Sequence, residues 1–134
     1  MRKTAMLVVV VMLSGCGKSN VMHYHIGRQS GNATLSLGGT TLIFEGIPDQ
    51  GADVPTKATG FFMISGSGTT NGNSSVDAVT LKYDYANGVT NLTFNDYGFK
   101  LTENGTKLVF GEQTFPLGTK TIRVAKDGSA KITE

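Results

Sequence analysis

Pairs of residues that suit tight hairpin turns divide most of this chain into short segments. Asn-Gly occurs at residues 87–88 and 104–105, and Gly-Gly occurs at residues 38–39. Such pairs favour two-residue turns in which both central residues have a positive φ. Each pair is flanked by alternating apolar and polar residues, so the sequence predicts three antiparallel hairpins.

The registers that these turns imply place mainly apolar residues opposite one another. Counting outward from each turn gives the facing pairs Tyr85–Thr90, Tyr83–Leu92, Leu81–Phe94, Leu101–Leu108, Phe99–Phe110, Leu35–Leu42 and Ala33–Phe44. Most of these pairs are apolar, and the residues between them are mainly polar. This is the pattern of antiparallel strands that bury one face and expose the other.

The pair Asp127-Gly128 needs a different loop. A two-residue turn there would place Arg123 opposite Ile132 and would mix the two faces. A three-residue loop over residues 126–128, with Gly128 in the left-handed conformation, keeps the faces separate. This bulged hairpin gives the pairs Ile122–Ile132 and Val124–Ala130 and, on the solvent side, Arg123–Lys131.

The remaining segments complete an all-β pattern. Residues 59–65 suggest a strand buried on both faces, residues 66–75 a mobile Gly/Ser/Thr/Asn loop, and residues 47–57 an irregular connection with two prolines. No stretch after Asn20 has the apolar spacing of three and four residues that indicates helices. We therefore expect a small antiparallel meander of about eight strands that forms a barrel or a two-layer sandwich.

The first sixteen residues have the order of an export signal. Arg2 and Lys3 precede an unbroken apolar stretch from Ala5 to Leu13, and small residues follow up to Cys16. A positive start, a short apolar core and a small-residue end are typical of a signal peptide. The apolar stretch is nine residues long, whereas a membrane-spanning helix needs roughly 20 residues. We therefore expect a cleaved signal and no permanent span.

Leu13-Ser14-Gly15-Cys16 resembles the lipobox of bacterial lipoproteins, and every position fits. The resemblance covers residues 1–16 only. It implies cleavage of residues 1–15, a diacylglyceryl group on the Cys16 thiol, and acylation of the new amino terminus by a fatty acid such as palmitate. Two or more acyl chains hold a protein stably at a membrane. Cys16 is the only cysteine, so one chain cannot form an internal disulfide.

The mature chain is then expected to have two parts. Residues 17–32 are polar and show no apolar pattern. We predict a lipidated flexible tether over residues 16–32, able to reach on the order of 50 Å when extended, and one all-β domain over residues 33–134. Gly17, and not an aspartate, follows Cys16. By resemblance to enteric lipoproteins, this favours the outer membrane, with the domain facing the periplasm or the cell surface.

Charge argues against a nucleic-acid partner. The chain carries 12 Lys and Arg against 10 Asp and Glu, but Arg2 and Lys3 belong to the signal. The mature chain is therefore formally neutral, and its charges are scattered singly. Nucleic-acid binding needs clustered basic residues.

His23 and His25 are the only histidines. In an extended segment they would share a face and could hold a metal ion together. A tight zinc site needs three or four ligands, and the chain offers no third histidine and no second cysteine. We therefore expect no metal site and place both histidines in the tether, near lipid headgroups.

No catalytic pattern stands out. The chain lacks Gly-x-Ser-x-Gly, His-Glu-x-x-His and a Walker-type loop, and no strand-to-helix pattern follows Gly66-Ser67-Gly68. Asp77, Asp84 and Asp96 could pair like glycosidase carboxylates, but solvated surface positions explain them better. We expect no catalytic residue and no cofactor.

Aromatic residues concentrate in neighbouring predicted strands, at Tyr83, Tyr85, Phe94, Tyr97 and Phe99. They could form a ligand-binding face. We favour a core in which the tyrosine hydroxyls lie at the rim, because a buried tyrosine keeps a polar end that needs a partner.

Together these features favour a non-enzymatic envelope lipoprotein. Its membrane partner is the bilayer, reached through lipid on Cys16, and its β domain has a binding or structural role toward an envelope protein or a small ligand. The alternative is an inhibitor or exclusion lipoprotein that blocks a hydrolase or a phage receptor through residues 66–75. A hydrolase with an unrecognised site is the third hypothesis.

Overall fold

The computed structural model describes residues 21–29, 32–47, 57–76 and 78–133. These residues form strands and no helix. The strands are β2 (Val21–Gln29), β3 (Asn32–Leu37), β4 (Thr40–Phe44), β5 (Ala58–Met63), β6 (Thr69–Val76), β7 (Val79–Ala86), β8 (Val89–Phe94), β9 (Tyr97–Thr102), β10 (Lys107–Phe110), β11 (Gln113–Pro116), β12 (Thr121–Val124) and β13 (Ala130–Ile132).

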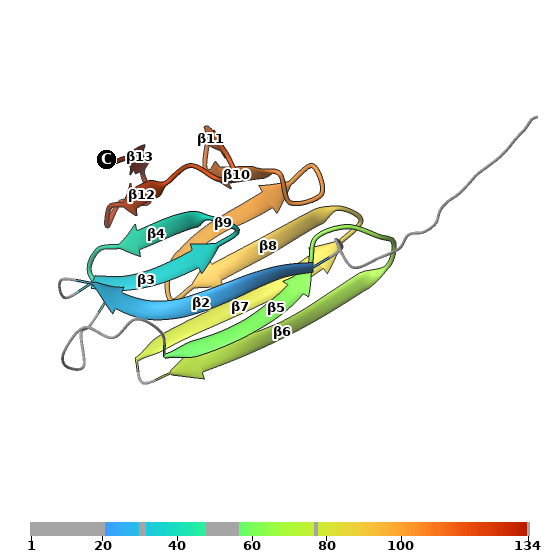
Figure 1. Cartoon of the computed structure of the whole chain (residues 1–134), viewed down its shortest axis with the longest axis horizontal. Coiled ribbons are helices and arrows are strands. Elements are labelled where there is room, and N and C mark those ends of the chain that lie inside the picture. Colours follow the sequence, from blue (N-terminus) through green and yellow to red (C-terminus); the bar gives the residue numbers. More distant parts are fainter. Residues whose placement is uncertain (1–20, 30–31, 48–56, 77, 134) are drawn as a thin grey trace, which may run out of the picture.

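The strands form two six-stranded sheets (Figure 1). The first sheet, in the order β11-β10-β9-β8-β7-β6, is an antiparallel meander. The second, in the order β13-β12-β4-β3-β2-β5, is antiparallel except where β12 runs parallel to β4. The sheets do not close into a barrel. The expected all-β class is confirmed, and the architecture is a sandwich.

The predicted hairpin registers are confirmed. Tyr85 pairs with Thr90, and the remaining predicted pairs also appear in the strand ladders, apart from Phe99 and Phe110. Those two rings stack with their centroids 4.9 Å apart. Residues 38–39, residues 87–88 and Gly128 all have the positive φ that their turns require.

The core lies between the sheets and is built from alternate residues of both. Phe44 of β4 is fully buried. Its ring centroid lies 4.6 Å from that of Phe94 and 5.7 Å from that of Phe99, both from the opposite sheet. Such aromatic pairs contribute about 0.5–1.5 kcal/mol each beyond the area that they bury. The contact between the sheets is therefore strongest around Phe44.

The predicted tether over residues 17–32 is wrong for most of its length. Residues 21–29 form β2, which pairs with β3 on one side and β5 on the other. Met22, Tyr24 and Ile26 point into the core and are at most 6% exposed. Because a strand between two others satisfies its backbone hydrogen bonds on both sides, this segment belongs to the domain. Residues 1–20 and 30–31 lie outside the described residues.

Two further expectations are corrected. Residues 59–65 do not form a strand buried on both faces, because β5 is an edge strand and Phe61 is exposed. The loop expected over residues 66–75 is largely strand β6, which pairs with β7 along its whole length. A polar edge strand needs no apolar residues, because backbone hydrogen bonds to one neighbour hold it.

The two ends of the sandwich are formed by different strand ends and turns. At one end β2 begins, with Val21 paired to Met63 of β5. The turn at residues 103–106 lies at the same end, since a Cβ on Gly105 would come within 2.8 Å of the Ile64 side chain. We call this the proximal end. The opposite, distal end holds residues 45–47, the turn at residues 95–96 and the loop at residues 125–129.

Candidate functional site

A cleft of about 500 Å³ opens at the distal end. Three segments that are far apart in the sequence form it: the end of β4, the β8–β9 turn and the β12–β13 loop. The lining residues are Gly46, Ile47, Asn95, Asp96, Tyr97, Gly98, Phe110, Val124, Lys126, Asp127 and Gly128. It lies at the opposite end of the sandwich from Val21.

Apolar and polar residues contribute about equally to the lining of the cleft. Ile47, Phe110 and Val124 are buried core residues that reach its inner surface. Asp96 and Lys126 are exposed at its mouth. Ligand sites combine apolar walls with polar groups that orient the ligand, and this cleft contains both kinds of residue.

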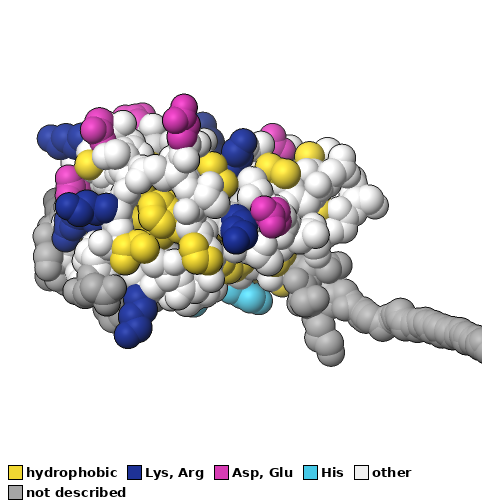
Figure 2. Space-filling view, turned by 90° about the horizontal axis from the view of Figure 1, so that it is seen from above, with side chains coloured by type: hydrophobic (Ala, Val, Ile, Leu, Met, Phe, Trp, Pro, Cys, Tyr) yellow, Lys and Arg dark blue, Asp and Glu magenta, His cyan; other side chains and the backbone are white. Residues whose placement is uncertain are grey.

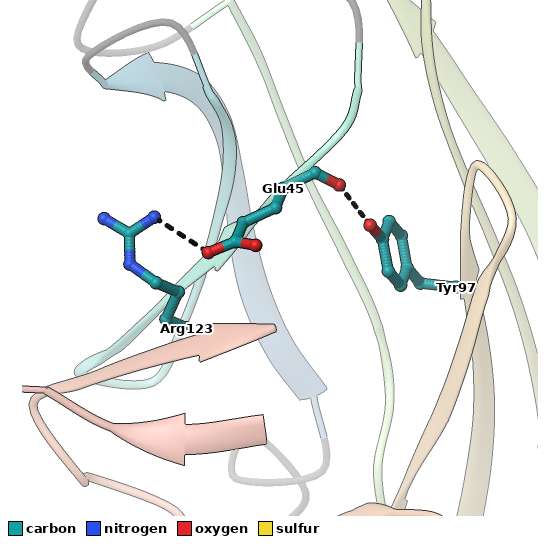
Figure 3. A network of polar contacts seen from close by, with 3 residues as sticks. All are labelled: Glu45, Tyr97 and Arg123. Carbon is teal, nitrogen blue, oxygen red and sulfur yellow. Dashed lines mark hydrogen bonds and ion pairs between the residues drawn. The ribbon is translucent and has the colours of Figure 1, made fainter. Parts of the chain in front are cut away.

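A polar network joins the two sheets beside the cleft (Figure 3). The Tyr97 hydroxyl donates a hydrogen bond to the backbone carbonyl of Glu45. The Glu45 side chain in turn forms an ion pair with Arg123, with 3.4 Å between Oε2 and Nη1. Both charged side chains are more than a third exposed, so the pair adds little stability. It holds Glu45 toward β12.

The environment of Tyr97 disfavours its ionised form. Burial raises the pKa of the Tyr97 hydroxyl above 10.0, and the negative charges of Glu45, Asp96 and Asp127 raise it further. Tyr97 is therefore a neutral hydrogen-bond donor at ordinary pH and does not supply a base.

The two turns that carry the rim are held by their own side chains. Asn95, at a positive φ of 54°, accepts a hydrogen bond from the Thr80 amide at 2.7 Å and donates one to the Ala78 carbonyl at 2.9 Å. Asp127 accepts hydrogen bonds from the Ser129 hydroxyl and amide. These bonds lower the pKa of the exposed Asp127 carboxyl. Asp127 is therefore ionised at the cleft mouth.

The cleft offers a ligand the Asp127 carboxylate and the exposed Lys126 side chain at its mouth. Polar contacts fix Tyr97 and Asn95, and the charges at the mouth lie on short turns. Among the residues that the structure describes, no three His, Cys, Asp or Glu side chains gather closely enough to hold a metal ion. The nucleophile–base pair that covalent catalysis needs is not found among the residues that line the cleft.

Two of the residues considered from the sequence lie at this cleft, Tyr97 of the aromatic group and Asp96 of the three aspartates. Asp96 is at its rim, whereas Asp84 is exposed on the outer face of the first sheet. Asp77 and Cys16 lie outside the described residues. The two described aspartates, Asp84 and Asp96, therefore lie on different surfaces of the domain and do not line one cleft.

The two histidines lie on the second sheet and not in a tether. His23 and His25 are exposed on the outer face of β2, on alternate residues from those in the core. His23 pairs with Phe61 and His25 with Thr59 of β5. They do share a face, as expected for an extended segment.

The aromatic residues form a core with tyrosine hydroxyls at its rim, as favoured from sequence. Phe94, Phe99 and Tyr85 are buried. The Tyr85 hydroxyl donates a hydrogen bond to the Gly66 carbonyl and accepts one from the Gly88 amide. At the distal end, the Tyr97 hydroxyl donates a hydrogen bond to the backbone carbonyl of Glu45.

The outer face of the first sheet is a second, weaker candidate. Three shallow hollows of 340 to 400 Å³ lie along it, lined by polar residues such as Lys82, Asn91 and Thr93.

Charges of both signs are interspersed on the side of the molecule that Figure 2 shows from above, with no large area of one sign. This agrees with the scattered charges of the sequence.

The sequence did not indicate that Lys126 and Asp127 line one cleft, or that Glu45 lies beside it in contact with Tyr97 and Arg123. Glu45 and Arg123 are 78 positions apart, and the parallel pairing of β4 with β12 brings them together. The Asp127-Gly128 turn was visible in the sequence, but its neighbour across the cleft was not.

Comparisons with protein-family models, with curated proteins and with solved structures found no match to this chain. The described part of the chain also contains no helix with the length and apolarity needed to cross a membrane.

Proposed function

We propose that this chain is a lipid-anchored envelope lipoprotein whose β sandwich is a binding module and not an enzyme. The lipobox at residues 13–16 supports the anchor. The distal cleft supports binding, because apolar core residues and charged side chains from separate segments of the chain meet there. The partner is an envelope protein or a small ligand.

The observation that carries this proposal is the position of the cleft relative to the anchor. β2 begins five positions after Cys16, so lipid on Cys16 would hold the proximal end close to the bilayer. The sandwich strands are up to nine residues long, which corresponds to roughly 30 Å. The cleft would then lie at the end of the domain that is remote from the lipid attachment, where other envelope components could reach it.

The alternative of an inhibitor that acts through a loop at residues 66–75 is weakened. Residues 69–76 pair with β7 as strand β6, so they do not protrude as a free loop. An inhibitory surface would have to use another part of the domain.

The anchor is tested by intact mass of the membrane-extracted protein. We expect the wild type to lose residues 1–15 and to gain acyl mass, and the Cys16→Ala variant to do neither. An unacylated, membrane-free wild type would contradict the proposal.

The membrane is tested separately by fractionation. Gly17 follows the lipidated cysteine, and we propose the outer membrane on that basis. In an enteric host we expect the wild type in the outer-membrane fraction and the Gly17→Asp variant in the inner-membrane fraction. Equal distribution of the two proteins would contradict this sorting.

The cleft is tested by site-specific photo-crosslinking in cells. A crosslinking amino acid at Lys126, on the cleft rim, should capture an envelope component. The same amino acid at Asn87, an exposed residue of the proximal end, is the matched control. Identical adducts from both positions, or none from Lys126, would count against the cleft as the binding site.

A further inference from the structure

An exposed aromatic residue lies on the outer face of the second sheet, near the start of β2. Phe61 is 59% exposed and pairs with His23, whose ring centroid lies 5.8 Å from that of Phe61. On the same face of the sheet, the next pair toward the proximal end is Val21 with Met63. We call these four residues the His23–Phe61 patch; β2 and β5, which carry it, lie side by side in Figure 1.

The patch has no role in the core. Alternate residues of the same strands, Met22, Tyr24 and Phe62, fill the space between the sheets. Phe61 and His23 point the other way, into solvent. Of the described residues, only Phe61 and Ile132 are large hydrophobic side chains with high exposure. An exposed apolar side chain within an apolar patch indicates an interaction surface.

The chain places this patch near the lipid. Five Cα–Cα steps join Cys16 to Val21, and they span at most about 18 Å when fully extended. His23 is two residues further along β2, which adds roughly 7 Å. These lengths limit the patch to within about 25 Å of the lipid attachment, whereas the 16 residues expected as a tether from the sequence would have allowed about twice that distance.

The charge of the same sheet suits a lipid surface. Its six strands, β13, β12, β4, β3, β2 and β5, contain no Asp or Glu. Glu45, just after β4, is paired with Arg123, and Lys131 of β13 is exposed. Carboxylates would be repelled by anionic headgroups, whereas exposed lysine near the surface is attracted to them.

We infer that the His23–Phe61 patch inserts into the headgroup region of the bilayer and holds the proximal part of the second sheet against the membrane. This inference rests on the proposed lipid anchor. The apolar faces of membrane-surface helices, which carry residues such as phenylalanine, lie about 5–10 Å into the boundary between headgroups and acyl chains. The anchor supplies the attachment, and the patch supplies the orientation, which directs the polar outer face of the first sheet outward.

The absence of tryptophan from the sequence allows a direct test. The Phe61→Trp variant carries a single fluorophore in the patch. Thr93→Trp is the matched control, because Thr93 is exposed on the outer face of the first sheet and pairs with Gly98, which leaves room for the ring. Both proteins are extracted from membranes, checked for acyl mass and for thermal unfolding, and reconstituted into vesicles of phosphatidylethanolamine, phosphatidylglycerol and a brominated phosphatidylcholine.

We expect the Phe61→Trp emission to shift to shorter wavelength and to be quenched by the brominated lipid, and the Thr93→Trp emission to do neither. An unquenched Phe61→Trp protein that carries acyl chains would overturn this inference and leave the anchor intact. Equal quenching of the two variants would also overturn it, because the domain would then have no preferred face. Quenching abolished at raised protein density would assign the patch to a second copy of the chain instead. A protein without acyl mass would overturn the anchor and this inference together.

Discussion

Two glycines on the edge strands lie beneath tyrosine rings from the neighbouring strands. Gly60 of β5 pairs with Tyr24, and Gly72 of β6 pairs with Tyr83. A Cβ at either position would come within 2.6 Å of the tyrosine Cζ. The ring of Tyr83 also packs against Phe62, with centroids 5.4 Å apart. These tyrosines close the open side of the sandwich, and a cross-strand aromatic ring over an edge glycine is a known way to stabilise such strands.

Replacing Gly60 with alanine should therefore destabilise the domain. The added methyl group would collide with the Tyr24 ring, and overpacking of this kind costs about 1–3 kcal/mol. The matched control is Gly98→Ala on β9, where a Cβ meets nothing within 4 Å. There we expect no loss, or a gain of about 0.5–1 kcal/mol, because glycine is unfavourable inside a strand. Urea unfolding of both variants measures the difference, and equal midpoints would contradict the proposed clash.

The Tyr97→Phe substitution should weaken the link between the β8–β9 turn and β4. It removes the hydrogen bond to the Glu45 carbonyl, which corresponds to a loss of about 1 kcal/mol at neutral pH. Thermal unfolding at pH 7 measures this loss. The exposed Asp96→Asn variant, next in the chain, is the control and should unfold nearly as the wild type does.

The same variant tests the pKa of Tyr97. Because the folded-state pKa is raised above 10.0, this group favours folding fully below pH 10, and its contribution is lost as the pH rises through the folded-state value. The free energy of unfolding of the wild type should approach that of Tyr97→Phe above that pH. A difference between the two proteins that stays constant from pH 8 to pH 12 would contradict the raised pKa.

Among the elements, β11 and β13 join the sheets at the other open side through one side chain. The Gln113 amide donates to the Ala130 carbonyl at 2.6 Å, and its oxygen accepts a hydrogen bond from the Ala130 amide at 2.9 Å. The side chain thereby pairs with the free edge of β13 as a neighbouring strand would. An edge covered in this way is protected from pairing with other chains.

We expect Gln113→Ala to free the edge of β13. Loss of two hydrogen bonds to a largely buried backbone should cost about 1–3 kcal/mol and should speed hydrogen exchange of the Ala130 amide. Gln113→Glu keeps the acceptor but not the donor and should retain part of the protection. The exposed neighbour Thr114→Ala is the control. Unchanged exchange at Ala130 in Gln113→Ala would contradict this role.

Strands that flank a Gly-Gly or Asn-Gly turn could be predicted from the sequence. The strands β2 and β6 could not, because their sequences carry no comparable signal. Gly-Gly at residues 38–39 and Asn-Gly at residues 87–88 predict hairpins directly, because both turns need positive φ. β2 carries only three core residues among polar ones, and β6 carries almost none. Their strand structure comes from pairing with neighbours, and local sequence reports that pairing poorly.

At the scale of the molecule, the position of β2 sets where the domain begins. A chain that starts at residue 33, where the sequence alone placed the boundary, would lack the strand between β3 and β5. It would also lose the burial of Met22, Tyr24 and Ile26, which contributes roughly 5–9 kcal/mol at 1.5–3 kcal/mol for each side chain. That is comparable to the whole stability of a small domain.

We therefore expect the chain that starts at residue 33 to be unfolded and the chain that starts at Val21 to be folded. Circular dichroism and a cooperative thermal transition distinguish the two outcomes. A cooperative transition in the shorter chain would restore the tether as the better description of residues 21–32.

The sequence by itself determined the all-β class and the hairpin registers, and it is the source of the proposal that Cys16 carries lipid. Turn geometry and the two-residue period of a strand are local, so nearby residues specify them. Only the tertiary structure decided between barrel and sandwich, brought β2 into the second sheet and placed Gly46, Tyr97 and Asp127 around one cleft. Those features depend on the parallel pairing of β4 with β12 and on contacts between the sheets. They join residues tens of positions apart, which no local pattern in the chain specifies.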